Sequence, residues 1–238
     1  MALPLNKDPM GQAIADYHRN GSAARLRVFS QSFDEDEIPV KTLFRSRDEM
    51  PAVEQEALRL ASGLILDVGA GAGCHSLALQ EMGKTVMAID ISPLAVETMR
   101  ERGVKDSRVQ DFFTLDGHFD TILMLMNGIG IVGTLSRMPA FFMQLDHLLT
   151  PGGQLLCDSS DICYIFEDED GFIDLTGVDG YYGELNYWMQ YKGIKGNRFP
   201  WLFIDPETLR EQAEAHGFKV EIVSRGDHYD YLARINRK

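Results

Sequence analysis

The sequence lacks the features of a disulfide-stabilised or membrane-spanning chain. Only three cysteines occur among its 238 residues, and their spacing indicates neither a disulfide framework nor a zinc site. No stretch approaches the roughly 20 consecutive apolar residues that cross a membrane. The opening stretch, MALPLNKDPM, contains no apolar run of signal-peptide length. We therefore expect a cytoplasmic protein in a reducing compartment, without a bound metal and without a membrane partner.

Positive charge is also scarce. The chain carries 23 lysine and arginine residues against 36 aspartate and glutamate residues, which gives a formal net charge of −13 at pH 7. Such a protein repels phosphate backbones unless a local basic patch compensates, and the sequence contains no dense basic patch. Nucleic acid is therefore a disfavoured partner, and a small-molecule substrate is expected.

The most informative stretch is 64–73, LILDVGAGAG. A short apolar run, glycines at Gly69, Gly71 and Gly73, and the helical pattern that follows predict a strand, a tight turn and a helix. The positive end of that helix points into the loop and can hold an anionic or polar ligand group. Asp67 adds a negative charge beside the loop. Such a site suits a ligand with one cationic and one anionic end, although a tight turn without any ligand would show the same glycines.

Two further strand ends carry polar side chains. The run KTVMAIDIS predicts a buried strand that ends at Asp90, where a carboxylate can bind the two hydroxyls of a ribose. The run RVQDFF places Asp111 and Phe112 after a third strand. A carboxylate can accept a hydrogen bond from the exocyclic amine of a purine, and an aromatic ring can stack on it. The alternatives are that Asp111 only forms a turn and that Phe112 or Phe113 belongs to the core.

Strands and helices alternate through the middle of the chain. This alternation predicts an α/β fold with a doubly wound, mostly parallel sheet, whose ligands bind at the carboxyl ends of the strands. The expected strands are 64–68, 84–90, 107–110, 119–126 and 153–159, and the expected helices are 75–82, 93–102 and 137–149.

Five motifs in this region together resemble those of one family. LDVGAGAG, AIDIS and QDFF resemble the first three motifs of the class I S-adenosylmethionine-dependent methyltransferases. FDTILMLMNGIG resembles their fourth-strand motif, and LLTPGGQLLCDSS resembles the turn into their fifth strand. The resemblance covers roughly residues 64–160. It implies a seven-stranded Rossmann-like sheet with an antiparallel last strand, S-adenosyl-L-methionine as the cofactor, and transfer of a methyl group.

The resemblance also implies a set of site residues. The implied cofactor-binding residues are Asp67, Gly69, Ala70, Gly71, Asp90, Ile91, Asp111, Phe112, Met126 and Asn127, with Tyr17 from the segment that commonly folds over the cofactor. Asn127 is also the candidate catalytic residue, because this position in the family often contacts the methionine end of the cofactor or the substrate. A plain Asn-Gly turn is the alternative. The run NGIG lacks the prolines and aromatic residue of amine- and amide-methylating members, so that subclass is not supported.

Two other function classes stay open on the sequence alone. A nicotinamide-dependent oxidoreductase would carry the pattern G-x-G-x-x-G, but Cys74 occupies the position of the third glycine. A non-catalytic module that senses or sequesters S-adenosylmethionine would share all of the motifs. No residue is assigned as a general base.

The flanking regions predict additions to the core within one domain, 1–238. Helices are expected at 9–20 and 51–63 and extended pieces at 23–33 and 38–44, whereas the acidic run EDED at 167–170 is expected to face solvent. A helix capped by Asp205 and an antiparallel pair of strands close the chain. The expected parts are an N-terminal extension and lead-in helix (1–62), a cofactor-binding core (63–160), an acidic loop with an inserted β-hairpin (161–204), and a C-terminal helix with strands (205–238).

The predicted β-hairpin is the most variable part of this domain organisation. The alternating runs GELNYWMQYKG and RFPWLFID, separated by GIKGN, predict two paired strands. Tyr187, Met189 and Tyr191 share one face, and Trp188 lies on the other. We predict that residues 181–203, together with the segment near Tyr17, form the wall and lid of an acceptor pocket. The alternative is that these aromatic side chains only pack on the edge of the sheet.

Overall fold

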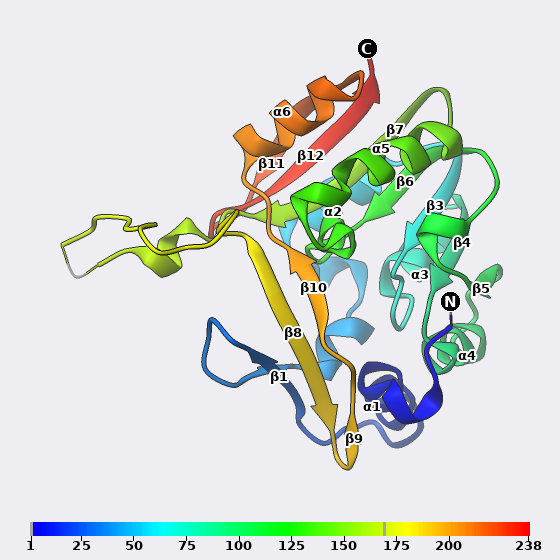
Figure 1. Cartoon of the computed structure of the whole chain (residues 1–238). Coiled ribbons are helices and arrows are strands. Elements are labelled where there is room, and N and C mark those ends of the chain that lie inside the picture. Colours follow the sequence, from blue (N-terminus) through cyan, green and yellow to red (C-terminus); the bar gives the residue numbers. More distant parts are fainter. Residues whose placement is uncertain (1, 169) are drawn as a thin grey trace.

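A seven-stranded sheet forms the centre of the computed structural model, which describes residues 2–168 and 170–238 (Figure 1). Its strand order is β11-β12-β7-β6-β3-β4-β5. Only β12 runs against its neighbours, since it pairs antiparallel with both β7 and β11 while the other pairs are parallel. This confirms the predicted fold class. The strands are β3 (Leu64–Val68), β4 (Thr85–Asp90), β5 (Ser107–Val109), β6 (Phe119–Met124), β7 (Leu149–Ser160), β11 (Phe218–Arg225) and β12 (Asp230–Arg237).

Helices cover both faces of this sheet because successive strand residues point to opposite sides. Leu66 and Ile122 pack in one core with α5 (Met138–Leu148) and α6 (Pro206–Ala215). Their neighbours Ile65 and Leu123 pack in a second core with α2 (Ala52–Leu60) and α3 (Cys74–Glu81). The fold is therefore doubly wound, as the alternation of strands and helices predicted.

A second, antiparallel sheet lies beside the first, in the strand order β10-β8-β1-β2 with β9 paired to β8. The predicted hairpin is confirmed, with Tyr187 opposite Phe199. Its strand β8 also pairs with β1, where Phe29 lies opposite Trp188. The N-terminal extension and the inserted hairpin thus form one sheet, which the sequence did not predict. Its strands are β1 (Leu26–Ser30), β2 (Asp36–Ile38), β8 (Glu184–Tyr191), β9 (Ile194–Lys195) and β10 (Phe199–Leu202).

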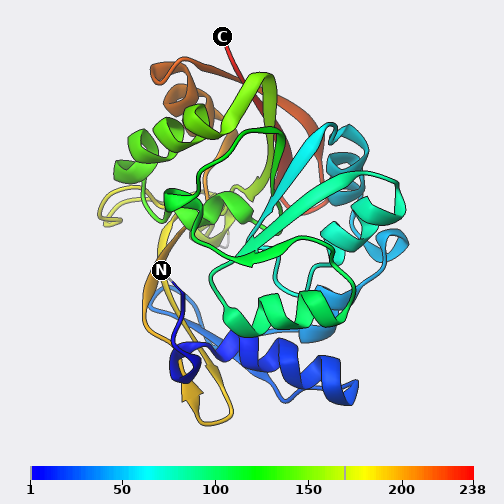
Figure 2. The same cartoon turned by 90° about the vertical axis from the view of Figure 1, so that its right-hand side faces the viewer.

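Helix α1 (Pro9–Asn20) lies alongside α4 (Pro93–Glu101) in both views of the fold (Figures 1 and 2). Asp8 caps α1 by accepting a hydrogen bond from the Gly11 N–H at 2.8 Å, and it also accepts one from the Ser92 hydroxyl. Ser92 in turn caps α4 by accepting from the Ala95 N–H at 3.0 Å. Two helix caps therefore bond to each other and fix the N-terminal helix on the core.

Short 3₁₀ helices complete the fold and correct one expectation. Residues 38–44 were expected to be extended, which is confirmed for Ile38 at the end of β2. From Val40 onward the expectation is wrong, because the Thr42 N–H bonds to the Pro39 carbonyl and begins a 3₁₀ turn that buries Val40 and Leu43. The acidic run at 167–170 is only partly tested, since Glu169 lies outside the described residues. The 3₁₀ helices are η1 (Leu5–Lys7), η2 (Val40–Phe44), η3 (Arg47–Glu49), η4 (Phe112–Thr114), η5 (Gly128–Val132), η6 (Leu135–Arg137) and η7 (Cys163–Phe166).

None of the helices within residues 2–168 and 170–238 is long and apolar enough to cross a membrane.

Candidate functional site

The glycine-rich loop after β3 is bonded to the end of β4. The N–H groups of Gly69 and Ala70 both donate to the Ile89 carbonyl, at 2.9 and 3.1 Å. Gly69 and Gly71 have positive φ angles of 68° and 56°, which favour glycine. Apart from the two neighbouring residues, a Cβ atom placed on Gly69 would meet no atom of the described residues within 4 Å. The main chain at Gly69 is therefore open to close approach by a ligand.

The third glycine has a different role. Gly73 also has a positive φ of 81°, but a Cβ atom there would lie 2.9 Å from both Met99 and Val104. Gly73 thus lets the start of α3 pack closely against the α4 region. This is consistent with a ligand set that contains Gly69, Ala70 and Gly71 but not Gly73.

Asp90 lies at the carboxyl end of β4, beside the glycine loop. One carboxylate oxygen accepts from the Gly71 N–H at 2.9 Å, and the other accepts from the Ser92 N–H at 2.8 Å. Burial of the carboxylate raises the pKa of Asp90 to about 6, although these two main-chain hydrogen bonds lower it. Because a carboxylate can accept about four hydrogen bonds, Asp90 retains capacity for the two hydroxyls of a ribose. Ile91, which follows it, is 40% exposed and can flank such a ligand.

Asp67 lies beneath the loop. Its side chain is 1% exposed and accepts hydrogen bonds from the Ser76 hydroxyl, at 2.6 Å, and from the Ser76 N–H. Burial raises the pKa of this carboxyl. The observed contact of Asp67 is with the first turn of α3, and its direct contact with a cofactor stays a prediction.

Asp111 and Phe112 follow the end of β5, and their side chains have different surroundings. Asp111 caps η4 by accepting from the Phe113 N–H at 3.0 Å. The ring of Phe112 is 3% exposed and packs 5.3 Å from the Phe113 ring and 5.8 Å from the Phe141 ring. Phe112 is therefore a core side chain in this structure, and its main chain is the part that remains to contact a base.

The turn after β6 has an uncommon backbone. Met126 and Asn127 are consecutive non-glycine residues with positive φ angles, 64° and 56°, and the fourth strand ends before them at Met124, two residues earlier than expected. The Asn127 amide donates to the Leu202 carbonyl at 3.2 Å and accepts from the Ser159 hydroxyl at 3.0 Å. Asn127 therefore ties β6 to β7 and β10, while the Met126 side chain is 38% exposed.

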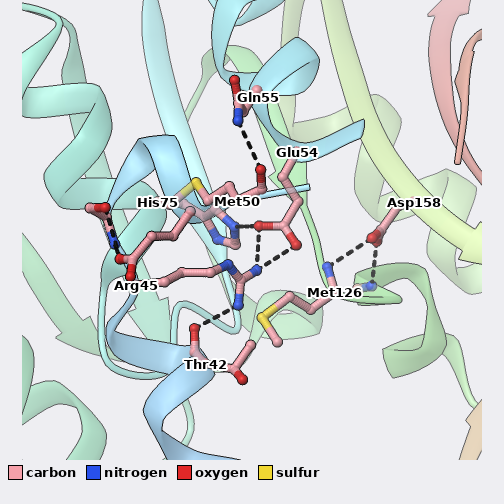
Figure 3. A network of polar contacts seen from close by, with 11 residues as sticks. Thr42, Arg45, Met50, Glu54, Gln55, His75, Met126 and Asp158 are labelled. Carbon is pink, nitrogen blue, oxygen red and sulfur yellow. Dashed lines mark hydrogen bonds and ion pairs between the residues drawn. The ribbon is translucent and has the colours of Figure 1, made fainter. Parts of the chain in front are cut away.

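A buried ionic cluster adjoins this turn and was missed by the sequence reasoning (Figure 3). Glu54 bonds to His75 Nε2 at 2.7 Å and pairs with the Arg45 guanidinium, and each of these side chains is 7% exposed or less. Hydrogen bonds from His75 and Arg45 hold the pKa of Glu54 below its usual value despite burial. Burial lowers the pKa of His75, but Cys74, Glu54 and Asp67 together raise it well above the usual value. The one signal in the sequence was a glutamate on the apolar face of α2.

Within this cluster, Arg45 has a buried Nε atom that finds no hydrogen-bond partner among the residues described. Its Nη1 donates to the Thr42 carbonyl at 2.6 Å. A buried guanidinium N–H without a partner is costly, so an acceptor from a ligand would stabilise it. The atom marks this cluster as a place where an anionic or polar ligand group fits.

Helix α1 covers the glycine loop from the other side. Ile14 packs in one cluster with Ala72 of the loop and Ala95 of α4. Tyr17, half-buried on the same helix, has its ring 4.6 Å from the Phe44 ring. Tyr17 and Phe44 also line a cavity of about 340 Å³ that Arg45 borders. The N-terminal segment thus packs against the glycine-rich loop, and its contact with the cofactor stays a prediction.

A larger cavity, of about 420 Å³, lies under the second sheet and is called the aromatic cavity below. Tyr187 contributes to it from the face of β8 that also carries Met189 and Tyr191, and these two residues pack against α1. Trp188 is on the opposite face, with its ring stacked 5.3 Å from Phe29. The lining residues are Val28, Phe29, Ser30, Phe33, Asp34, Glu35, Asp36, Ile162, Tyr164, Ile165, Tyr187 and Phe203.

Comparison with known proteins relates the chain to methyltransferases. A family profile described as "Methyltransferase domain" matches residues 65–153. The chain is 36% identical over 110 residues to a ubiquinone biosynthesis O-methyltransferase of Xanthomonas euvesicatoria pv. vesicatoria, and this match spans 41% of the chain and 43% of that protein. The chain thus matches less than half the length of such curated relatives.

Similarity to solved structures extends over the whole chain. A SAM-dependent methyltransferase from Bacteroides fragilis, crystallised in complex with S-adenosyl-L-homocysteine, is 57% identical, with a TM-score of 0.94 and coverage of 100% of this chain and 98% of that chain. The CcbJ methyltransferase from Streptomyces caelestis shares the fold alone, at 15% identity, a TM-score of 0.61, and coverage of 96% and 98%.

The chain belongs to the S-adenosylmethionine-dependent methyltransferases. Its cofactor is S-adenosyl-L-methionine, as the sequence motifs predicted. Membership of this family removes the nicotinamide-dependent alternative. The open main chain at Gly69, the carboxylate of Asp90 and the unpartnered Arg45 Nε are the features of this structure that fit such a cofactor.

Proposed function

We propose that this protein transfers the methyl group of S-adenosylmethionine to a small molecule bound in the aromatic cavity. The position of that cavity carries the proposal. Phe203 lines it and directly follows Leu202, whose carbonyl accepts the hydrogen bond from Asn127. Ile162 lines it from the segment that follows β7. The cavity therefore adjoins the carboxyl ends of β6 and β7, where parallel sheets of this kind bind their ligands.

The predicted cofactor residues lie along the same edge of the sheet. Asp90 would bind the ribose, and the main chain of Gly69 to Gly71 would lie against the ligand, which the open space at Gly69 supports. Ile91, Asp111 and the main chain of Phe112 would flank the base. Arg45 would donate a hydrogen bond to the carboxylate of the methionine end, since its buried Nε has no partner among the described residues. The remaining members of the proposed cofactor-binding set are included because of where they lie: Met126, Asn127, Asp67 and Tyr17.

For methyl transfer, the main tasks of the protein are to align the acceptor with the methyl group and to exclude water. S-adenosylmethionine supplies a methyl group on a sulfonium, which is a good leaving group. Holding two reactants in the reactive geometry can supply on the order of 7–11 kcal/mol. The aromatic walls of the cavity and the cover formed by α1 would limit the access of water to the reactants.

Asn127 acts in this proposal as a positioning residue rather than as an acid or base. Both ends of its amide are already bonded, to Leu202 and to Ser159. Ser159 in turn accepts from the Ile204 N–H at 3.0 Å. Asn127 would therefore hold the turn that lies between the cofactor and the cavity.

A small acceptor is also supported by charge and by the names of relatives. The net charge of −13 disfavours nucleic acid. The Xanthomonas relative is named for ubiquinone biosynthesis, and a relative from Tropheryma whipplei, 31% identical over 103 residues, is named demethylmenaquinone methyltransferase. Both names concern small molecules.

Formation of S-adenosylhomocysteine in the presence of a panel of small acceptors tests the proposal. We expect turnover with at least one acceptor, and no gel shift of tRNA or duplex DNA beyond weak non-specific association at low salt. Tight, salt-sensitive binding of tRNA would contradict the small-molecule assignment. Cofactor binding without turnover across a broad panel would instead favour a module that only binds S-adenosylmethionine.

A further inference from the structure

The aromatic cavity has a marked imbalance of charge. Three acidic residues, Asp34, Glu35 and Asp36, lie on its rim, and none of the residues known to line it is basic. We propose, on the basis of the function proposed above, that this cavity recognises an acceptor through an aliphatic ammonium group attached to an apolar or aromatic body.

The walls supply surfaces that favour a cation. The Phe33 ring lies 6.4 Å from the Tyr187 ring with an interplanar angle of 26°. The Phe203 ring lies 6.3 Å from Tyr187 with an angle of 53°. These three rings contact one another in series and form one aromatic wall of the cavity. The face of an aromatic ring attracts an ammonium group, and it does so more strongly where water is excluded.

The carboxylates of the rim differ in how they are already paired. Glu35 forms a bidentate ion pair with Arg27, in which Arg27 Nε donates to Glu35 Oε1 at 2.6 Å, so the charge of Glu35 is compensated. Asp36 accepts only from the Glu37 N–H, at 2.7 Å, and Asp34 forms no ion pair with any part of the chain that is described. Two carboxylates of the rim therefore remain without a cation.

One of these carboxylates belongs to the same sheet as the aromatic wall, since Asp36 pairs with Val28 of β1 and β1 pairs with β8, which carries Tyr187. Burial raises the pKa of Tyr187 to about 12, and the charges of Tyr164 and Asp36 add to that rise. Asp36 and Tyr187 both line the cavity. A carboxylate beside a ring face is a combination that binds an ammonium group and repels a carboxylate of similar size.

The two ends of the cavity also differ, since one end is acidic and the other is apolar. Asp34 and Asp36 come from the turn between β1 and β2 and from β2 itself, whereas Ile162 and Phe203 come from segments that follow β7 and β10. An acceptor that spans the cavity places its ammonium group at the β1–β2 turn and its apolar body against Ile162 and Phe203. The atom that receives the methyl group is then a different atom from the ammonium nitrogen. This agrees with a turn sequence, NGIG, that lacks the motif of amine-methylating members.

Three matched probes test the inference: tryptamine, tryptophol and indole-3-acetate, which share an indole ring and differ in charge. Their binding is measured by calorimetry on the full chain in the presence of S-adenosylhomocysteine. We expect tryptamine to bind at least about tenfold more tightly than tryptophol, and indole-3-acetate to bind least, because the cavity favours a cation by this order of magnitude.

The variant for this test is the double substitution Asp34→Asn with Asp36→Asn. Both side chains are exposed, so the variant is expected to fold, and its circular dichroism and melting temperature check this. It should weaken tryptamine binding about tenfold while leaving tryptophol binding within about twofold. Glu214→Gln, which removes an exposed negative charge from α6, is the control and should change neither affinity.

Equal or tighter binding of tryptophol or indole-3-acetate, no saturable binding of tryptamine, or unchanged affinity of the folded double variant would each overturn the inference. A different set of results would contradict the proposed function. Cation-selective binding with no methyl transfer to any acceptor would sink the proposed function and leave this inference standing. Methyl transfer to acceptors whose binding does not depend on charge would overturn only the inference.

Discussion

Asp158 holds Met126 in place at the end of β6. One oxygen of its buried carboxylate accepts from the Met126 N–H at 3.0 Å, and the other accepts from the Gly128 N–H at 3.1 Å. Two consecutive left-handed residues lie in this turn. Each such residue costs on the order of 1–3 kcal/mol and persists only where its surroundings over-determine it. Asp158 supplies that support from the neighbouring strand β7.

The first prediction concerns this support. Asp158→Asn places an amide N–H₂ against one of the two N–H donors, so one hydrogen bond is lost and the turn relaxes. We expect a loss of about 1–3 kcal/mol in the free energy of unfolding and a fall in kcat. Urea denaturation and steady-state kinetics measure the two effects.

Asp120→Asn is the matched control. Asp120 also accepts two hydrogen bonds, from the Leu64 N–H and the Thr150 hydroxyl, both at 2.8 Å, but near the amino end of β6. It should lower stability by a similar amount and leave kcat unchanged. Equal kcat in the two variants would mean that the turn at Met126 does not position the reactants.

The second prediction is a dependence of stability on pH. Burial raises the pKa of Asp158 to about 7 and that of Asp90 to about 6, whereas the usual value is 3.8. The folded protein therefore holds protons that the unfolded chain has released, so the free energy of unfolding falls as the pH rises from about 4 to about 7. His75, whose pKa is raised, acts in the same direction above pH 6.5.

Denaturant unfolding at pH 5 and pH 8 checks this sign. The pKa values of Glu54 and Asp205 are lowered, so the stability that they contribute is nearly complete by pH 5 and opposes the trend only below that pH. The slope should be smaller in Asp158→Asn than in the unaltered protein. A protein that is more stable at pH 8 than at pH 5 would contradict the assignment of the raised pKa values.

The third prediction concerns the ribose site. Asp90→Asn removes a charged acceptor, and hydrogen bonds to charged groups contribute about 1.5–3 kcal/mol. Affinity for S-adenosylhomocysteine should therefore fall roughly tenfold to a hundredfold, as measured by calorimetry. Asp106→Asn, which alters an exposed carboxylate paired with Arg108, should leave the affinity unchanged. Unaltered binding by a folded Asp90→Asn protein would remove Asp90 from the site.

The fourth prediction separates the two faces of β8. Trp188 stacks on Phe29 and lies under the Arg198 guanidinium, 4.6 Å from the ring centre, on the face of β8 opposite Tyr187. Trp188→Ala should cost about 1–3 kcal/mol of stability, less than the usual core value because the ring is half-buried, and should leave turnover intact.

Tyr187→Leu is the comparison from the opposite face. Its ring lines the cavity, so the change should lower turnover and leave affinity for S-adenosylhomocysteine within about twofold. Thermal melts, cofactor titration and turnover on both variants give the result. Lost turnover in Trp188→Ala with unchanged turnover in Tyr187→Leu would show that the cavity does not bind the acceptor.

The sequence by itself determined the parts of the protein that depend on neighbouring residues. The glycines at 69, 71 and 73 predicted a strand, turn and helix because positive φ angles and helix starts are properties of a few consecutive residues. The place of Asp90 at a strand end followed from the same local pattern. Element boundaries in the core agree to within one or two residues at most of these positions, since apolar periodicity marks them.

Only the tertiary structure decided which distant residues meet. Phe29 pairs with Trp188 across the second sheet, and Asp158 reaches Met126 from another strand. Glu54 became the centre of a buried ionic cluster because α2 packs beside the start of α3. The orientation of a side chain at such a point is set by packing between elements, which local periodicity does not encode. For this reason the sequence predicted the cofactor loop, while the aromatic cavity and its acidic rim emerged only from the fold.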